Sequence, residues 1–389
     1  MHCIKYLIIA FLFSFFLEAC QEEDTVIKNT YKYLKPDYNK IQVEGTTDTL
    51  HFLLNDSSYN DIESLNIFED KGTEFISFFD QRSEALLIYR ASGGEMVNRI
   101  PLKSILKKKS FYKTDVFVKN YDSIFITNRT SLYLVDSFGH LKASAAFITT
   151  PTNAYALLDN SCPPIVVGGK LYTGVKPSIY KERLKTYRNW KVIYEFKLSE
   201  DSVKLKYNLP EMYHSHLYGF QYLSNSFCYN NHNRFVFSFA ADTNIYETDL
   251  DNYNMTYYGK TLYQQAPVKW KNNNANKDED DKNYLTGEAY GAIYFDPFKR
   301  RYLRVAKKRI SEANYEAKDR SREQSLIVFD EAFRIIGESP LERNISLSSL
   351  LFTRNGDIYA RVNKKDEYAI HFLRLEYKER HNQHGLTNK

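Results

Sequence analysis

A repeated pattern of short apolar strands separated by polar turns is the feature that most constrains the fold. An apolar run at 75–79 is followed by a second run at 85–89, a turn at 92–94 and a third run at 96–102. Comparable groups of runs recur along the chain, and the last of them lies between residues 350 and 375. Short strands separated by turn residues are typical of all-β proteins. The pattern therefore predicts an all-β fold.

The spacing of these groups favours a β-propeller over a β-sandwich. Six groups can be counted, roughly 45 to 65 residues apart, and each is long enough for a four-stranded sheet. We predict six blades, with five or seven as alternatives because the spacing is irregular. The 32 Tyr and 26 Phe agree with this fold, since strands collect aromatic side chains on their pleated surfaces. A closed ring of blades would also leave only short, protected strand edges.

The first twenty residues resemble a bacterial lipoprotein signal. Lys5 precedes a stretch, 6–17, that is apolar except at Ser14. A membrane-spanning helix needs roughly 20 apolar residues, whereas a secretory signal needs about 7 to 15. The sequence Leu17-Glu18-Ala19-Cys20 resembles the lipobox, in which the cysteine receives a diacylglycerol and the chain is cut before it. The alternative is a buried N-terminal helix with an incidental cysteine, and Glu18 departs from the usual small or apolar residue.

These observations divide the chain into four parts. We expect a signal peptide at 1–19, a lipidated Cys20 with a tether at 20–50, a propeller at 51–380 and a polar tail at 381–389. The acidic run 21–24 resembles the export signal of surface-exposed lipoproteins in the Bacteroidetes, and a plain solvated tether is its alternative. The expected partner is therefore the outer membrane, bound through the lipid anchor, with surface exposure favoured over a periplasm-facing position.

Two cysteines remain once the signal peptide and the lipid anchor are assigned. They are Cys162 and Cys228. An oxidising envelope would let them form a disulfide if their Cα atoms lie within about 7 Å, and two separate buried thiols are the alternative. The sequence contains no Cys/His spacing typical of a zinc site.

Other ionisable groups give no strong sign of a catalytic or metal site. The histidines His214, His216 and His232 lack a carboxylate or cysteine at the spacing of a metal site, and the acidic stretch 278–281 departs from the calcium-loop pattern. Five aspartates end or follow strands: Asp80, Asp136, Asp249, Asp296 and Asp330. Two of them could form a glycosidase pair, but aspartate at a strand end is also an ordinary turn former. We therefore assign no catalytic residue and no metal ligand.

Aromatic residues crowd the middle of the chain. A candidate ligand face is formed by five of them: Trp190, Tyr213, Tyr218, Tyr222 and Trp270. Aromatic rings with polar tips suit sugar rings and protein partners. Packing within and between blades is the alternative role for these side chains.

Runs in the body of the chain resemble a known family. The segments 84–89 and 294–304, together with the lipobox, are similar to a Bacteroidetes lipoprotein family catalogued as a domain of unknown function, family 4221. The resemblance covers nearly the whole mature chain and rests on strand and turn signatures. It implies a propeller-like envelope protein and no particular chemistry, because that family has no assigned activity.

The combined expectation is an outer-membrane-anchored lipoprotein of unknown molecular activity. Its propeller is expected to bind a glycan, a peptide or an envelope protein without catalysis, and the alternative is a polysaccharide hydrolase or lyase on the same scaffold. A third interpretation, a structural subunit of an envelope complex, predicts a large exposed apolar patch. We expect no cofactor and no nucleic-acid partner, since the formal net charge is only +5. The oligomeric state stays open.

Overall fold

The computed structural model describes residues 29–380 apart from 61, 104–113, 129, 149–153, 178–182, 265, 272–276 and 365. The signal peptide expected at 1–19, Cys20 and the tail expected at 381–389 lie outside this part of the chain. Within it, strands make up most of the regular structure. None of its helices has both the length and the apolar character that a membrane crossing needs.

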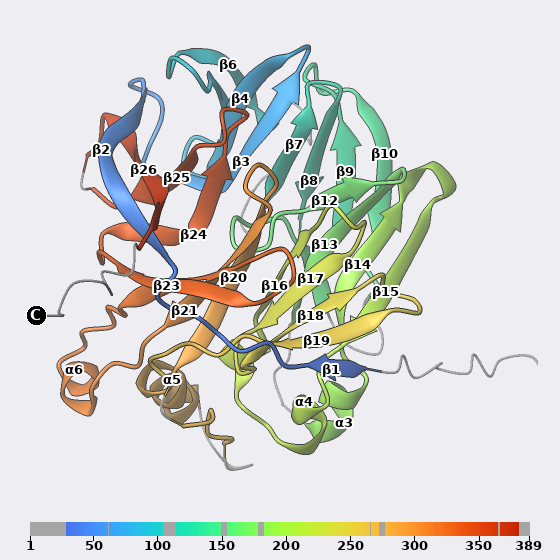
Figure 1. Ribbon diagram of the computed structural model, residues 1–389. Coiled ribbons are helices and arrows are strands. Elements are labelled where there is room, and N and C mark those ends of the chain that lie inside the picture. Colours follow the sequence, from blue (N-terminus) through green and yellow to red (C-terminus); the bar gives the residue numbers. More distant parts are fainter. Residues whose placement is uncertain are drawn as a thin grey trace, which may run out of the picture.

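Six sheets are arranged in sequence order around a common centre (Figure 1). We number them as blades 1 to 6 and name the strands of each blade from the innermost outward. The first three blades are β3 (Ile62–Asp70), β4 (Thr73–Asp80), β5 (Ala85–Arg90) and β6 (Met96–Pro101); β7 (Val116–Asn120), β8 (Ser123–Thr127), β9 (Ser131–Val135) and β10 (Leu141–Ala146); and β11 (Ala154–Leu157), β13 (Lys170–Pro177), β14 (Lys191–Lys197) and β15 (Ser202–Asn208), with β12 (Ile165–Val167) beside β13.

The last three blades follow the same plan. They are β16 (Asn225–Tyr229), β17 (Phe235–Phe239), β18 (Asn244–Thr248) and β19 (Asn254–Tyr258); β20 (Ala289–Asp296), β21 (Arg301–Lys307), β22 (Gln324–Phe329) and β23 (Ile335–Leu341); and β24 (Ile345–Phe352), β25 (Ile358–Val362), β26 (Ala369–Glu379) and β2 (Ile41–Leu53). Short helices lie between strands: α3 (Leu184–Arg188), α4 (Met212–Ser215), α5 (Lys277–Thr286) and α6 (Glu312–Glu316), with 3-10 turns η1 (Leu198–Glu200) and η2 (Phe220–Leu223). The predicted all-β propeller of six blades is confirmed.

The N-terminal strand β2 closes the ring. It pairs antiparallel with β26, from Ile41 opposite Glu379 to Leu53 opposite Ala369, and Figure 1 shows it in blue along the outer edge of the red blade. The predicted boundary at residue 51 is therefore wrong, because the propeller already includes Ile41. The middle of β2 is mostly polar and half-buried or exposed, as expected for an outermost strand. This polar composition is the reason why the sequence alone indicates part of a tether in this segment.

Residues before β2 also contact the ring. The strand β1 (Thr30–Lys32) pairs in parallel with β19 and adds a fifth strand to blade 4. The chain therefore passes from the edge of blade 4 to the edge of blade 6 before it closes the propeller.

The aromatic residues mainly fill the spaces within and between blades. The largest cluster of buried side chains joins blades 2, 3 and 4 and includes Phe196, Phe227, Phe237 and Phe239. In blade 6, the fully buried ring of Phe52 packs edge-on against Tyr89 of blade 1 and Phe372 of its own sheet, with ring centroids 5.4 and 5.6 Å apart. Burial of these rings stabilises the fold in proportion to the apolar area that leaves water.

Two adjacent residues of β2, Phe52 and Leu53, allow a test of this packing. Replacing Phe52 with Ala should lower the free energy of unfolding by about 3–5 kcal/mol, because it removes a buried ring and leaves a cavity. The adjacent Leu53 is 69% exposed, and Leu53→Ala should change stability by no more than about 0.5 kcal/mol. Urea unfolding of both variants measures the difference. Equal losses in the two would contradict the role of Phe52 in ring closure.

Candidate functional site

Two hollows open at the same end of the propeller. We call it the starting end, meaning the end at which the innermost strands β3, β16, β20 and β24 begin. One hollow is lined by residues that precede β3 and by the turn between β25 and β26. The other is lined by the first residues of β16, β20 and β24, among others. Because Ile345 at the start of β24 pairs with Val362 at the end of β25, the two hollows share this end.

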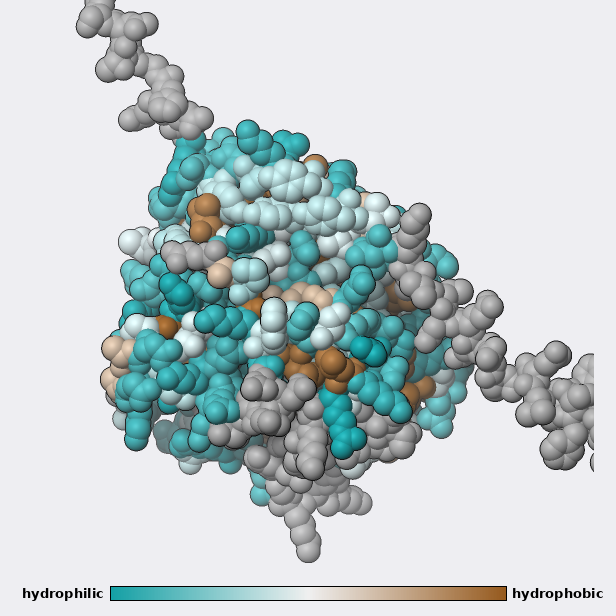
Figure 2. Space-filling model, turned by 90° about the horizontal axis from the view of Figure 1, so that it is seen from below, coloured by the Kyte–Doolittle hydropathy of each residue, from teal (hydrophilic) through white to brown (hydrophobic). Residues whose placement is uncertain are grey.

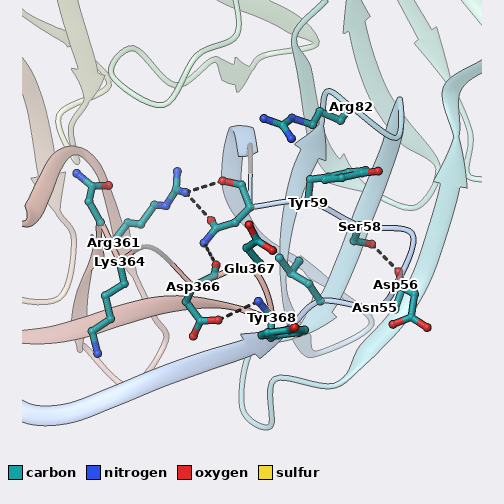
Figure 3. A pocket seen from close by; sticks show the side chains of 13 residues that line it. Asn55, Asp56, Ser58, Tyr59, Arg82, Arg361, Lys364, Asp366, Glu367 and Tyr368 are labelled. Atoms are coloured by element: carbon teal, nitrogen blue, oxygen red, sulfur yellow. Dashed lines mark hydrogen bonds between the residues drawn. The ribbon is translucent and has the colours of Figure 1, made fainter.

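The larger hollow lies between blades 6 and 1, and we call it the blade 6–1 pocket (Figure 3). Its volume is about 700 Å³, within the range of known ligand pockets. Three segments line it: the β2–β3 loop, the turn between β4 and β5, and the chain from the end of β25 to the start of β26. Its lining side chains include Tyr59, Asn60, Arg82, Arg361, Lys364, Asp366, Glu367 and Tyr368.

Asn60 ties the two blades together at the floor of this pocket. Its amide nitrogen donates to the carbonyl oxygens of Asp366 at 2.7 Å and Ala369 at 3.2 Å, while its side-chain oxygen accepts from the guanidinium of Arg361 at 2.7 Å. A single side chain from the β2–β3 loop thus bonds to both ends of the β25–β26 turn. This cross-linking gives the pocket a preorganised floor.

Two tyrosine rings stand at the rim. Tyr59 is 45% exposed and Tyr368 is 78% exposed. The guanidinium of Arg82 lies over the Tyr59 ring, 5.3 Å from its centroid. Figure 3 shows Tyr59 and Arg82 on one side of the pocket, with Arg361 and Lys364 across from them. The rim therefore offers aromatic faces next to hydrogen-bond donors.

The charges that line the pocket are balanced. Three cationic side chains, Arg82, Arg361 and Lys364, face a similar number of carboxylates, including Asp366 and Glu367. A hydrogen bond from His371 lowers the pKa of Asp366, so this carboxyl stays ionised and is a poor proton donor. In the part of the chain that the structure describes, no group of three His, Cys, Asp or Glu residues could hold a metal ion.

A chain of hydrogen bonds connects strand β2 to the blade 6–1 pocket. The Thr49 hydroxyl lies 2.8 Å from His51 Nε2, His51 Nδ1 lies 2.6 Å from Nδ1 of His371, and His371 Nε2 contacts Asp366. An ionised carboxylate only accepts, so Nε2 of His371 carries a proton, and when this ring is neutral its Nδ1 accepts. His51 therefore donates through Nδ1 and accepts from Thr49. When both rings are neutral, they are therefore in opposite tautomers.

These tautomers can be read by nuclear magnetic resonance. In uniformly ¹⁵N-labelled protein at neutral pH, we expect His51 to carry its proton on Nδ1 and His371 on Nε2. Replacing Asp366 with Ala should remove the preference at His371, because the carboxylate imposes it. His140, whose Nδ1 contacts Asp136 far from this chain of bonds, serves as an unaffected reference. Protonation of both rings on Nε2 would contradict the arrangement.

Four of the five aromatic residues predicted to form a ligand face are buried. The exposed fraction is 2% for Trp190, 0% for Tyr213, 6% for Tyr218 and 1% for Tyr222. The hydroxyl of Tyr213 donates to the carbonyl of Tyr222 and accepts from the amide of Ala241, so even its polar tip is used inside the protein. The prediction was wrong for these four, because their clustering reflects packing beside blades 3 and 4.

Only Trp270 of that set is exposed, at 62%. Its ring lies against His216 with centroids 4.4 Å apart. His214 is on α4, near the turn after β17, whereas His232 is in the turn between β16 and β17 at the other end of the same blade. The three histidines therefore form no common site.

The two cysteines do not pair. Cys162 and Cys228 are both free and buried, and burial raises the pKa of each thiol. Cys162 packs in the same cluster as Phe227, whereas Cys228 packs in the cluster between blades 4 and 5. Because successive side chains of a strand point to opposite faces of the sheet, Cys228 points away from the face that Cys162 contacts. The possible disulfide is absent, and the two cysteines are separate buried thiols, which was the favoured interpretation.

The strand-end aspartates act as turn formers. Oδ1 of Asp249 accepts from the backbone amides of Asp251, Asn252 and Tyr253. The same side chain-to-backbone pattern occurs at Asp80, Asp136, Asp296 and Asp330. None of the five is among the described residues that line either hollow. The acidic stretch 278–281 lies in helix α5, where Asp280 pairs with Lys271 at 2.9 Å.

One side of the molecule gives no support to the structural-subunit interpretation. Figure 2 shows the side below the view of Figure 1, and its described atoms are mostly hydrophilic with small, separate hydrophobic areas. Among the described residues, this side therefore shows no extended apolar patch of the kind that a large permanent interface uses.

The protein is a six-bladed β-propeller, because its six sheets form a ring that β2 closes. Hollows at one end of the ring have room for ligands. The sequence matches the model of a Domain of unknown function (DUF4221) over residues 40–340, so the chain belongs to this family. The resemblance inferred from the sequence is thereby confirmed. No curated protein is found to match the chain.

Solved structures share the fold. A DUF4221 family member from Bacteroides vulgatus is similar at 19% sequence identity with a TM-score of 0.73, and the alignment covers 88% of this chain and 100% of that one. A protein from Bacteroides fragilis whose description proposes export has 11% identity and a TM-score of 0.51, with 90% and 99% of the two chains covered. At these identities the likeness extends to the fold and no further.

Proposed function

We propose that this chain is a lipid-anchored envelope protein that binds a glycan, without catalysis, in the blade 6–1 pocket. The observation that carries the proposal is the pair of exposed rings, Tyr59 and Tyr368, at the rim of a pocket of about 700 Å³. Aromatic faces stack on the C–H faces of sugar rings, and amide and guanidinium groups match sugar hydroxyls.

The charge pattern of the pocket supports a glycan over a strongly charged ligand. Cationic and anionic side chains are mixed along its walls, so neither a polyanion nor a polycation is selected. The fixed floor built by Asn60 and Arg361 lowers the entropy lost when a ligand binds. A glycoside hydrolase needs a carboxyl that can donate a proton, and Asp366 does not suit that role because the hydrogen bond from His371 lowers its pKa.

The lipid anchor rests on the sequence around Cys20. Thr30, at the start of β1, lies ten residues after Cys20 in the sequence. A fully extended chain of ten residues reaches about 35 Å at most. An anchored propeller would therefore stay close to the outer membrane, with the edge of blade 4 nearest to the attachment point. The acidic run 21–24 supports display on the cell surface.

Glycan binding can be tested on the soluble propeller. A glycan array should give signals that Tyr368→Ala and Tyr59→Ala each weaken by about tenfold, because each removes one stacking face. Phe138 is 85% exposed on blade 2, so Phe138→Ala is the matched control and should bind like the wild type. Loss of signal in the control, or full binding by both Tyr variants, would contradict the site. Release of shortened products from a bound glycan would establish the hydrolase or lyase instead.

Membrane attachment has its own test. In cells of the native host, Cys20→Ala should move the protein from the membrane fraction to the soluble fraction, because the acylated thiol is lost. Cys3→Ala is the matched control, since this residue lies in the expected signal peptide. Protease added to intact cells should digest the wild type if it is on the surface. Protection until the outer membrane is broken would contradict surface display, and unchanged attachment of Cys20→Ala would contradict the lipid anchor.

A further inference from the structure

The smaller hollow at the starting end is a second candidate site, which we call the axial cup. It has a volume of about 230 Å³ and is lined by the first residues of β16, β20 and β24. These are innermost strands that lie next to one another around the centre of the ring (Figure 1). We propose that the cup binds a single small, hydroxylated carboxylate of the uronic acid class.

The backbone around the cup departs from regular strand pairing. The register of β20 shifts between Tyr290 and Ile293, and that of β24 shifts between Ser346 and Leu350. Such bulges bend a strand and redirect its side chains, and they are frequent next to functional sites. Both irregularities fall on strands of the cup wall.

Lys307 supplies a positive charge to the cup. A Cβ atom added to Gly291 would lie 3.2 Å from Cε of Lys307 and 3.3 Å from Cβ of Val305. The missing side chain at Gly291 therefore makes the room in which the lysine stem lies across β20. Gly291 and Lys307 both line the cup, so the stem reaches the cavity over the bulge.

The charge of Lys307 has no counter-ion among the residues that the structure describes. No carboxylate oxygen there lies within 4.0 Å of its amine, whereas the neighbouring Lys308 pairs with Glu323 at 2.9 Å. Lys307 is also the one charged side chain among the described lining residues. A lysine that lines a cavity and has no carboxylate partner there favours an anionic ligand.

The remaining polar groups indicate that the anion also carries hydroxyls. Oδ1 of Asn225 is buried and has no hydrogen-bond donor among the described residues. A buried acceptor without a donor is unfavourable, and rotation of the Asn225 side chain toward the cup would let a ligand hydroxyl donate to this oxygen. Ser224, Ser346 and Ser348 also line the cup, and the hydroxyls of the last two lie 2.9 Å apart. Hydroxyl groups both donate and accept, which suits the alcohols of a sugar acid.

The size of the cup limits the ligand to one sugar unit. The cup has a volume of about 230 Å³, which is about a third of the roughly 700 Å³ of the blade 6–1 pocket. The proposal is independent of glycan binding in that pocket, because the two hollows share no lining residue. A carboxylate seated at Lys307, with hydroxyls toward Asn225 and the serines, would satisfy each of these polar groups.

Calorimetric titration of the propeller with galacturonate and glucuronate tests the proposal. We expect binding of at least one of them by the wild type, and Lys307→Met should weaken it by about tenfold to a hundredfold, because a charged hydrogen bond is lost. Lys308→Met is the matched control and should bind like the wild type. Tyr368→Ala, which tests the blade 6–1 pocket, should also leave uronate binding unchanged.

A second variant separates binding from folding. Asn225→Ala should weaken uronate binding several-fold without lowering the melting temperature, because its oxygen makes no hydrogen bond within the described residues. The proposal is overturned if neither uronate binds the wild type, if Lys307→Met binds as tightly, or if neutral glucose competes equally. Equal affinity for inorganic phosphate would also overturn it, since the cup would then be a general anion site.

Discussion

The pairing of β2 with β26 is the constraint on which the rest of the structure depends. It joins residues more than 300 positions apart, Ile41 and Glu379 among them, and turns six consecutive sheets into a ring. Without it, blade 6 would expose the edge of β26, and the interface of blade 6 with blade 1 would lose Phe52. The blade 6–1 pocket depends on the same pairing, because its walls are the loop after β2 and the turn before β26.

Buried polar contacts then set how neighbouring blades sit against each other. Arg304 of β21 is fully buried, and burial lowers its pKa to about 10. Its guanidinium donates to Ser238 and to the carbonyls of Phe239, Asp242, Thr243 and Gly259, and it lies 3.7 Å from the centroid of the Tyr290 ring. A buried charge is tolerated when its donors are satisfied in this way. These bonds join blade 5 to the turns of blade 4 beside the axial cup.

The features that sequence reasoning found are local ones, and those it missed are formed by distant segments. Asp249 was recognisable as a turn former because its bonds reach only the next four residues. Tyr213 and Trp190 were misread, since a cluster of aromatics in sequence looks the same whether it faces solvent or another blade. Asn60 and Arg361 gave no signal, because they meet only when the ring closes. The polar turn residues between strands were the only available hint of the pocket.

The sequence by itself determined the fold class and the family and favoured six blades over five or seven, because strand periodicity and turn residues act over a few positions and recur along the chain. Tertiary structure alone decided that β2 belongs to blade 6, that Cys162 and Cys228 do not pair, and which side chains surround the two hollows. The physical reason is that a propeller builds its ligand-sized hollows between blades. Residues as far apart in sequence as Asn60 and Arg361 become neighbours there only after β2 has paired with β26.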